Sequence, residues 1–508
     1  MKLSSFFSIF VLLLVGLNAY PQPAAVTWLE KNKNEKEQRI LSLMRVNDQS
    51  FYLLRANAQN HAQVVMLNEK GEEVLAKSIP GLAPDGQDVY EQSVSNDSLM
   101  LVLYAQWEGN RRTAWYARVF NYLTLRWSAP PALAGSGKTR STTALSAIQA
   151  GIRRSQDGSH TCVYYLQPLS GQWEVNVLMY DAHFGLLWEK SAVLPPQEAG
   201  ILPRQVFCSN DGAVLIHAQV FSKGASISIS TPQQFNGPAS NDGSPIFKND
   251  YSAEKGQAAS NNAFFVMTNS GADWQSFFPK VMTKYTRSLE ISESPKGYIL
   301  CAGLGGNEEV SAATHYFLYK IDLREPKGEV LKFAELPLSF RKAYLNENRA
   351  KDKAPVEQVF VRKIIWEQQT PWILTEYEDF STAQLWVKEA ALVKIDSTWK
   401  MSTVVPVNKS HKLTASLPGS ESTAAVLPAP KGGWWLMHQT GVGTEATVTL
   451  TPSKGKESFE LSPARQSGVA AQWHTLYPYQ GRWWLVGLSG DLRSYRIGHI
   501  TPAAKKRE

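Results

Sequence analysis

A glycine-rich segment, ALAGSGKT at Ala132–Thr139, comes within one residue of a phosphate-binding loop. Gly137, Lys138 and Thr139 occupy the positions that such a loop requires, but Ala132 stands where its first glycine belongs. A phosphate-binding loop also needs a strand before it and a helix after it, and neither pattern is present here. The segment is therefore interpreted as a loop between two structural units.

A group of carboxylates suggests a different chemistry. Glu376, Glu378 and Asp379 flank Tyr377 within Thr375–Glu389, which the sequence predicts to be a loop. Two carboxylates at a suitable separation can cleave a glycosidic bond, but sequence spacing does not reveal that separation. Exposed charge on a loop is the competing interpretation. These four residues are candidate ligand-binding residues, and no catalytic residue is assigned.

The nine histidines show no metal-ligand spacing, so no metal site is predicted. His217 and His438 occupy matching places in two repeated units and are interpreted as buried, hydrogen-bonded histidines. The three cysteines each lie in an apolar run and are expected to be buried thiols. Their odd number leaves at least one of them unpaired.

The 16 tryptophans divide into two groups. The pairs Trp434–Trp435 and Trp483–Trp484 lie within strand-like runs, where packing between sheets is the expected role and sugar binding is the alternative. A periodic set that follows a recurring turn is also assigned to packing: Trp127, Trp188, Trp274 and Trp399. Trp107 and Trp173, which we expect on loops, are further candidates for ligand contact.

The elements that would position these residues repeat along the chain. Val177–Leu194 contains an apolar run, a turn at Asp181–Gly185 and a second apolar run, which predicts a β-hairpin. Six similar hairpins begin at Val64, Val119, Phe264, Tyr319, Val393 and Thr447. A polar turn followed by a short apolar strand precedes each one, as in SNDG at Ser209. Each unit is thus four strands, a to d, with tight a–b and c–d turns.

Tandem four-stranded units of this kind resemble β-propeller repeats, and the resemblance covers nearly all of the chain after its first residues. The SxDG turn resembles the a–b turn of bacterial propellers, and YDxxxGLLW at Tyr180 is similar to quinoprotein-type repeats. The resemblance implies an all-β fold of eight blades, with seven as the alternative. The adjacent cysteine pair of quinoproteins is absent, so no cofactor is expected.

The last unit offers only three strands, and Ala24–Glu30 is expected to supply its outer strand and close the ring. Residues 24–500 are predicted to form one domain, followed by a polar tail at 501–508. Longer connections fall between strands b and c or between d and the next a, on one face of the molecule. The longest is a low-complexity insertion at Ser222–Asn262.

Three other segments are expected to be long connections on that face. They are Ala132–Ala144, Asn408–Glu421 and Arg341–Ala354, the last of which is charged and suits a short helix. Binding residues are found disproportionately on loops that a rigid scaffold carries, so this face is the expected binding face.

Residues 1–19 have the pattern of a cleaved signal peptide: one lysine, an apolar run from Phe6 to Val15, then small residues. The run is about half the length of a membrane span, which disfavours a retained anchor, and no lipidation cysteine follows it. We expect a secreted or periplasmic monomer without a transmembrane span. The net charge of +7 is dispersed, so nucleic acid is not an expected partner.

The fold alone does not determine function, because the same scaffold hosts enzymes and binding modules. Our first hypothesis is a non-catalytic binding or scaffold protein that recognises a protein or a glycan through its loop-rich face. The alternative is a carbohydrate-active hydrolase or lyase with carboxylates at the mouth of the central channel.

Overall fold

The computed structural model describes residues 26–500 apart from these gaps: 35–37, 58–60, 83–87, 110–111, 139–148, 170–171, 196–200, 222–259, 270–273, 280–284, 307–311, 325–326, 380–384, 414–424, 429–433, 441–446, 453–458, 464–469, 481 and 490–492. The signal peptide and the polar tail, which the sequence predicts at 1–19 and 501–508, lie outside the described residues. So does most of the insertion predicted at 222–262, although its last three residues begin a strand.

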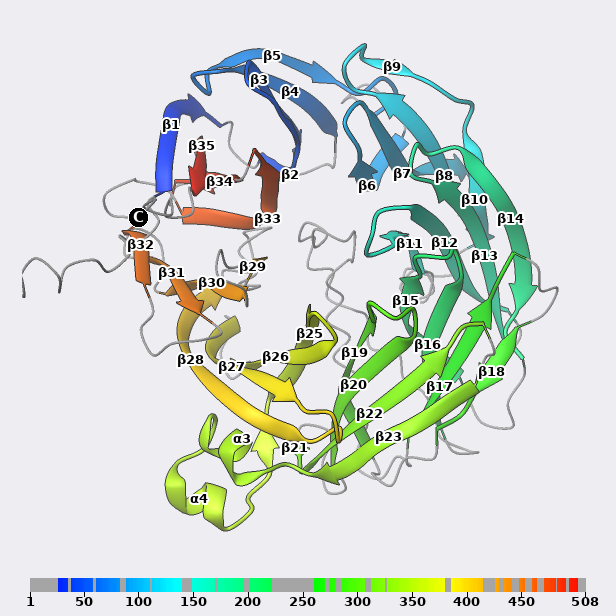
Figure 1. Ribbon diagram of the computed structural model, residues 1–508. Coiled ribbons are helices and arrows are strands. Elements are labelled where there is room, and N and C mark those ends of the chain that lie inside the picture. Colours follow the sequence, from blue (N-terminus) through cyan, green and yellow to red (C-terminus); the bar gives the residue numbers. More distant parts are fainter. Residues whose placement is uncertain are drawn as a thin grey trace, which may run out of the picture.

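The described residues form an all-β fold in which consecutive antiparallel strands build one sheet after another (Figure 1). The first sheet contains β2 (Arg39–Val46), β3 (Ser50–Ala56), β4 (Ala62–Asn68) and β5 (Glu73–Ser78). The second contains β6 (Asp88–Ser95), β7 (Leu99–Gly109), β8 (Arg112–Asn121) and β10 (Ala132–Lys138), with β9 (Arg126–Trp127) beside β8. The third contains β11 (Gln149–Arg154), β12 (His160–Leu169), β13 (Gln172–Asp181) and β14 (Leu186–Val193). The fourth contains β15 (Ile201–Cys208), β16 (Val214–Phe221), β17 (Ser260–Met267) and β18 (Gln275–Phe277).

The remaining sheets follow the same order. The fifth contains β19 (Tyr285–Glu293), β20 (Ile299–Gly306), β22 (His315–Asp322) and β23 (Lys327–Glu335). The sixth contains β25 (Val359–Glu367), β26 (Thr370–Asp379), β27 (Leu385–Ile395) and β28 (Met401–Leu413). The seventh contains β29 (Ala425–Pro428), β30 (Trp434–Thr440), β31 (Thr447–Pro452) and β32 (Phe459–Pro463). The eighth contains β33 (Ala470–Tyr479), β34 (Arg482–Leu488), β35 (Ser494–Ile500) and, at its outer edge, β1 (Val26–Lys33).

A small insertion lies between the fifth and sixth sheets. The two-residue strands β21 (Ala312–Ala313) and β24 (Val356–Glu357) pair there. The short helices α3 (Leu338–Lys342) and α4 (Glu347–Lys351) precede β24 and lie on the outside of the molecule (Figure 1). A helix within Arg341–Ala354 is therefore confirmed.

Side chains of turn residues explain why the polar segments become tight turns. In the a–b turn of the second sheet, Asn96 Oδ1 accepts hydrogen bonds from the backbone N–H groups of Ser98 and Leu99. In the fourth sheet Ser209 Oγ accepts from Ala213 N, and Gly212 has a φ of +77°. The short polar side chain thus accepts a backbone hydrogen bond within the tight turn, and the glycine supplies the positive φ that the turn needs. The tight a–b turns predicted from the sequence are confirmed.

Hydrophobic clusters join neighbouring sheets rather than the two faces of a sandwich. For example, Met179 of the third sheet and Val214 of the fourth share one cluster with Trp274. The clusters among the described residues connect the eighth sheet to the first and then each sheet to the next, up to the seventh. Because a single sheet buries too little apolar surface alone, every unit depends on its neighbours.

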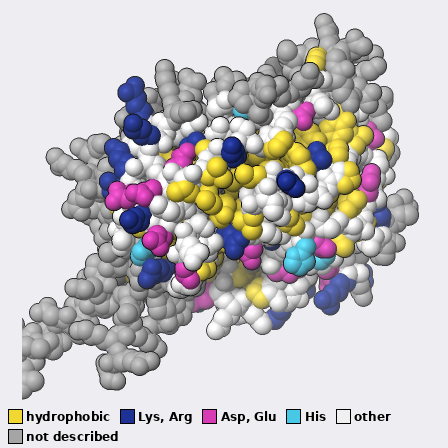
Figure 2. Space-filling view, turned by 90° about the horizontal axis from the view of Figure 1, so that it is seen from above, with side chains coloured by type: hydrophobic (Ala, Val, Ile, Leu, Met, Phe, Trp, Pro, Cys, Tyr) yellow, Lys and Arg dark blue, Asp and Glu magenta, His cyan; other side chains and the backbone are white. Residues whose placement is uncertain are grey.

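The outer strands leave apolar side chains in contact with solvent. On β14, Leu186 and Leu187 are each 49% exposed, and on β5 Val74 is 51% exposed. Figure 2 shows the molecule from above the view of Figure 1, and hydrophobic side chains gather across the side that faces the reader. The apolar clusters between the sheets therefore extend to a partly apolar outer surface.

The N-terminal strand is bonded to both the last and the first sheet. β1 pairs antiparallel with β35, and the Trp28 ring packs so closely on Gly498 that a Cβ there would lie 2.5 Å from the ring. On the other side, Glu30 N donates to Lys70 O at 3.1 Å. Asn32 donates to the carbonyl of Gly71, and its side-chain oxygen accepts from Glu73 N at 2.9 Å.

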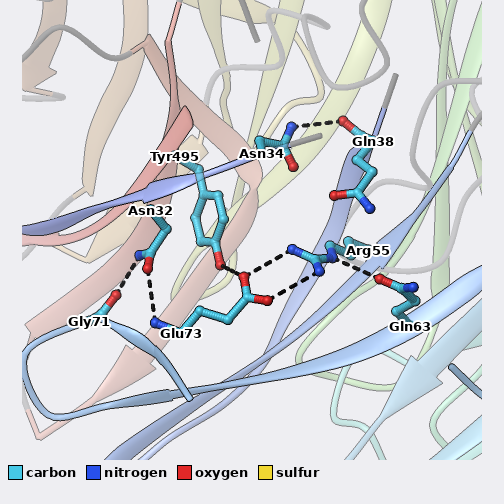
Figure 3. Close-up of polar contacts among 8 residues, drawn as sticks. All are labelled: Asn32, Asn34, Gln38, Arg55, Gln63, Gly71, Glu73 and Tyr495. Atoms are coloured by element: carbon cyan, nitrogen blue, oxygen red, sulfur yellow. Dashed lines mark hydrogen bonds and ion pairs between the residues drawn. The ribbon is translucent and has the colours of Figure 1, made fainter. Parts of the chain in front are cut away.

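A partly buried polar network lies beside this strand (Figure 3). Arg55 donates two hydrogen bonds to the Glu73 carboxylate, at 3.0 and 3.2 Å, and one to Gln63 at 3.0 Å. The hydroxyl of Tyr495, on β35, donates to the same carboxylate at 3.0 Å. Burial, with Glu73 beside it, raises the pKa of Tyr495 well above its usual range. One carboxylate therefore accepts donors from both the first and the last sheet.

We predict that Glu73→Leu destabilises the protein by about 3 kcal/mol, because it leaves the Arg55 guanidinium buried without its counter-ion. Tyr495→Phe, which removes one hydrogen bond, should cost about 1 kcal/mol. Urea unfolding followed by tryptophan fluorescence measures both. Glu69→Leu, which removes the same charge from the neighbouring exposed turn, is the control. A Glu73→Leu protein as stable as this control would show that the network does not hold the two sheets together.

Candidate functional site

The innermost strands of five sheets each carry a β-bulge near their starts. The pairing of strands a and b skips one residue, which is Leu41, Glu91, Arg204, Arg287 or Arg362 in the first, second, fourth, fifth and sixth sheets. A bulge bends the strand and re-aims the extra side chain. Four of these five residues are charged, so the bulges concentrate charge at one end of the inner strands. We call Arg204, Arg287, Arg362, Phe360 and Glu376 the bulge site.

The bulge site lies on the face that carries the b–c and d–a connections, since each inner strand begins there. We call this the mouth face. Phe360 stands at its centre, with the Arg287 guanidinium 4.0 Å from the ring centroid and the Arg362 guanidinium 4.9 Å from it. Arg287 belongs to the fifth sheet and the other two residues to the sixth, so this stack crosses between sheets. Cation–π contacts of this kind favour a fixed arrangement of the two cations.

Glu376 lies behind the stack. Its carboxylate approaches Arg362 Nε at 3.5 Å, and its side chain is 3% exposed while that of Arg362 is 23% exposed. The solvent-facing partner of this ion pair is therefore the cation. The backbone also ties the two sheets here, because Val361 N donates to Ser288 Oγ at 2.9 Å.

Arg204 extends the bulge site to the fourth sheet. Its Nε donates to Gln219 Oε1 at 2.7 Å, which holds the side chain along its own sheet. The neighbouring Gln205 donates to Glu290 of the fifth sheet at 3.4 Å. The three arginines thus occupy corresponding positions on three consecutive sheets, and direct contacts connect those sheets.

A line of buried polar side chains supports the same region. His217 hydrogen-bonds Asn262 Oδ1 at 2.9 Å, and Asn262 donates to Thr286 Oγ1 at 3.1 Å, next to Arg287. The His217 ring also stacks on Phe264. Burial, opposed by the Asn262 bond and assisted by Arg204, lowers the pKa of His217 to about 4. His217 is therefore neutral at ordinary pH, and the expectation of a buried, satisfied histidine is confirmed.

Glu91 is the acidic member of the bulged residues. Its side chain is exposed at the surface, and partial desolvation by the neighbouring strands raises the pKa of Glu91 to about 7. The next residue, Gln92, accepts from Ile152 N at 2.8 Å and so fixes the inner strands of the second and third sheets to each other. A carboxyl group that keeps its proton near neutral pH is a feature of general acids.

The opposite face is held by contacts between neighbouring a–b turns. Asp157 N donates to Asn210 Oδ1 at 3.0 Å, and Asn210 N donates to Glu293 Oε2 at 2.7 Å. These bonds run through the third, fourth and fifth sheets and involve backbone groups directly. The two faces therefore differ: one is tied by its turns, and the other presents the bulge site.

The structure places the acidic candidates on strands and not on a loop. Strand β26 continues to Asp379 and β27 begins at Leu385, so the loop predicted at Thr375–Glu389 was wrong for the described residues. Glu376 is buried in its ion pair, and Tyr377 packs at the edge of a hydrophobic cluster. Glu378 and Asp379 pair through their backbones with Val387 and Trp386. The sequence analysis treated Thr375–Glu389 as a polar loop. Apolar residues on both sides of the segment extend the strand pairing into it.

The two aromatic candidates differ. Trp107, near the end of β7, is 54% exposed and lies towards the mouth face. Trp173, on β13, is 6% exposed, and its Nε1 donates to Ile201 O at 2.7 Å. The expectation that both lie on loops was wrong, because long b and c strands continue through these positions. Trp173 packs between the third and fourth sheets, and Trp107 stays a candidate contact.

The glycine-rich segment is a strand as well. Residues Ala132–Lys138 form β10, which pairs with β8, so the predicted loop was wrong over that range; Thr139 lies outside the described residues. Gly135 faces the Tyr165 ring, and a Cβ there would lie 2.2 Å from it. This glycine serves close packing between the second and third sheets. Likewise, β28 extends to Leu413 and shortens the connection predicted at Asn408–Glu421.

The packing assignments from the sequence are otherwise confirmed. Cys162, Cys208 and Cys301 are free, buried thiols. Trp434 packs edge-on against Trp372, and Trp484 packs at a tilt against Phe51. The periodic tryptophans Trp127, Trp188, Trp274 and Trp399 join the inter-sheet clusters; the first two lie on strands, and the last two lie just before a strand.

Sequence reasoning missed the bulged residues. The signal that could have found them is a charged residue in the first half of an otherwise apolar inner strand, as in LPRQVF around Arg204 and VFVRKII around Arg362. Such a residue breaks the period-two alternation of a strand. Aligning the sequences of the eight units on their a–b turns would have brought these charged residues to corresponding positions.

Within the described part of the chain, no three His, Cys, Asp or Glu side chains gather closely enough to hold a metal ion. No described helix is long and apolar enough to cross a membrane.

Comparison with known proteins finds no family model and no curated protein that matches this chain. Solved structures do match. The WD40 domain of SCAP from fission yeast shares 9% identity over 94% of this chain and 98% of its own, with a TM-score of 0.38. The polysaccharide lyase Uly1 shares 12% identity over 92% of this chain and 100% of its own, with a TM-score of 0.37.

A third match is prolyl oligopeptidase B from Galerina marginata, with 9% identity and a TM-score of 0.41. The match covers 89% of this chain and 55% of that enzyme, so this chain spans about half its length. The class of protein that the tandem four-stranded sheets define is the β-propeller.

We predict that Glu91→Gln stabilises the protein at pH 8 and leaves its stability unchanged at pH 4. At pH 4 Glu91 is mostly protonated in both the folded and the unfolded states, so its raised pKa carries little cost there. Between pH 4.5 and about 7 the unfolded state releases a proton that the folded state retains, which favours unfolding as the pH rises. Scanning calorimetry at both pH values tests this, with Glu69→Gln as the exposed control. An equal effect at both pH values would contradict the raised pKa.

Proposed function

We propose that this chain is an exported, eight-bladed propeller that binds a protein or a glycan on its mouth face without transforming it. In this proposal each sheet is one blade, β1 completes the last blade, and the seventh and eighth blades meet to close the ring. The contacts of β1 with both the last and the first sheet support closure. The eight consecutive sheets favour eight blades over seven.

The observation that carries the binding proposal is that side chains of the bulge site are already engaged with one another. Two guanidinium groups contact its aromatic ring, and its carboxylate is buried in an ion pair. Glu376, the carboxylate that the sequence suggested for chemistry, therefore has little access to a ligand. A preorganised charged surface on rigid strands loses little side-chain entropy when a ligand binds.

One observation favours the alternative, a carbohydrate-active hydrolase or lyase. The raised pKa of Glu91 suits a carboxyl group that donates a proton at neutral pH. Glu91 lies on the inner strand of the second sheet, and its bulge corresponds to that of the arginine-bearing strands. Glu91 is thus the residue on which an enzymatic function would depend.

Export is part of the proposal and has its own test. If residues 1–19 are a cleaved signal peptide, N-terminal sequencing of protein recovered outside the cytoplasm should begin between about Tyr20 and Ala25, after the small residues. A variant with Leu12→Arg, which interrupts the apolar run, should be retained with its first residues intact. Recovery of an intact Met1 from the wild-type protein in a membrane fraction would contradict the proposed cleavage.

The function is tested with the insertion. Phe221 pairs with Ser260, so residues 222–259 begin and end side by side, and a short Gly–Ser link can replace them as a hairpin turn. We expect the melting temperature to change by less than about 2 °C and the affinity for envelope glycans and envelope proteins to fall. Calorimetry and retention on immobilised envelope fractions measure the two effects.

The same samples separate binding from catalysis. A binding module should leave the glycans intact, with no new reducing or unsaturated ends. Release of such ends by the wild type, but not by Glu91→Gln, would replace the binding proposal with the enzymatic one. No retention of any fraction by the folded wild type would overturn both.

A further inference from the structure

We propose that Cys162 and Cys208 form a disulfide bond under oxidising conditions and so cross-link the third and fourth sheets. This pair lies apart from the bulge site, and the inference does not depend on the binding function. The proposed export matters only as the source of an oxidant in the cell, because exported proteins meet oxidising conditions and cytoplasmic thiols are kept reduced.

The first support is the way in which the two strands meet. Cys162 lies on β12 of the third sheet, Cys208 ends β15 of the fourth, and these two strands contact each other. His160, two residues before Cys162, has its Nδ1 atom 2.9 Å from the carbonyl oxygen of Asn210, two residues after Cys208. This contact brings the two cysteines to the same level of the interface between the sheets.

The second support is contact between sulfur atoms. Cys208 Sγ lies 4.0 Å from Met179 Sδ, and Met179 pairs directly with Cys162 across strands β13 and β12. All three side chains belong to one hydrophobic cluster. A hydrogen bond with the Cys162 thiol, together with burial, raises the pKa of the Cys208 thiol well above its usual range. The two thiols therefore already interact before any bond forms between them.

The third cysteine belongs to a different cluster. Cys301 lies on β20 and packs among apolar residues of the fourth and fifth sheets. Burial raises the pKa of the Cys301 thiol well above its usual range, whereas the pKa of Cys208 responds first to Cys162. The pairing of Cys162 with Cys208 is therefore specific, and Cys301 is expected to stay a thiol.

The reaction is thiol–disulfide exchange with a disulfide oxidant. One cysteine thiolate attacks a sulfur of the oxidant, forms a mixed disulfide and releases the first thiol of the oxidant. The other cysteine attacks the mixed disulfide, forms the bond between Cys162 and Cys208 and releases the second thiol. The protein loses two protons and two electrons, and the oxidant gains them as its disulfide becomes two thiols.

Burial determines when this reaction can occur. In the folded protein Cys162 is 0% exposed and Cys208 is 1% exposed. The raised pKa keeps Cys208 protonated, and only a thiolate attacks a disulfide. We therefore expect the bond to form while the chain folds, before the third and fourth sheets close over the pair.

Refolding with oxidised glutathione tests this inference. The reduced protein is unfolded in urea and refolded with the oxidant, and its thiols are then counted in urea. One of the three thiols should remain, and the intact mass should fall by two hydrogen atoms. A tryptic digest without reductant should link the peptides Ser155–Lys190 and Gln205–Lys223. The oxidised protein should melt about 5 °C higher than the reduced one, because the bond restricts the unfolded chain.

Cys301→Ala is the matched control, since it removes the cysteine of the other cluster. It should form the same link and retain no thiol. Cys162→Ala and Cys208→Ala should each show no link between the two peptides, and the oxidant should not raise their melting temperatures. Circular dichroism establishes that each refolded variant is folded before its thiols are counted.

Three thiols in the folded wild type after refolding with the oxidant would overturn the inference. So would a link that involves Cys301, or an oxidised protein that melts no higher than the reduced one. None of these outcomes changes the retention expected on envelope fractions, so the proposed binding function would stand if this inference failed.

Discussion

The first and last sheets of this fold are joined by β1 and by one shared hydrophobic cluster. Each sheet buries apolar side chains only against its neighbours, so an array with two free ends would leave two apolar faces and two strand edges in water. β1 reduces this cost at both places: it extends the last sheet through β35 and bonds the β4–β5 turn of the first. The Glu73 carboxylate, which accepts from Arg55 and Tyr495, adds a polar contact between the two sheets.

The candidate site uses the rigidity that this packing supplies. A β-bulge in an isolated sheet would be a weak point, because one residue leaves the ladder. Here the inner strands are held on both sides, for example by Gln92 against the third sheet and by Ser288 against the sixth. The bulged side chains can therefore be charged and still keep fixed positions. Arg287 and Arg362 illustrate this, since both guanidinium groups contact the one Phe360 ring.

The two faces of the molecule divide the structural roles. The a–b turns contact one another through backbone donors, which favours a stable face: Asp157 N donates to the Asn210 side chain, and Asn210 N donates to the Glu293 carboxylate. The mouth face carries the bulges and the ends of the long b and c strands. Function on propellers depends on the residues placed on the scaffold and not on the scaffold itself. The distribution of charge on the mouth face is therefore the better guide to a ligand than the fold.

The sequence by itself determined the repeating unit, because tight turns and apolar strands leave local signals: a serine or asparagine that accepts backbone bonds, a glycine with positive φ, and two apolar runs. It also determined the buried state of the cysteines and of His217. It misplaced the strand ends at Trp173 and Glu376, since a strand continues as far as its neighbours offer hydrogen bonds, and that is not a local property. Tertiary structure alone decided that Arg204, Arg287 and Arg362 occupy corresponding bulges on consecutive sheets and that Arg55, Glu73 and Tyr495 meet. These groups come from different sheets, and only the packing of the sheets brings their side chains together.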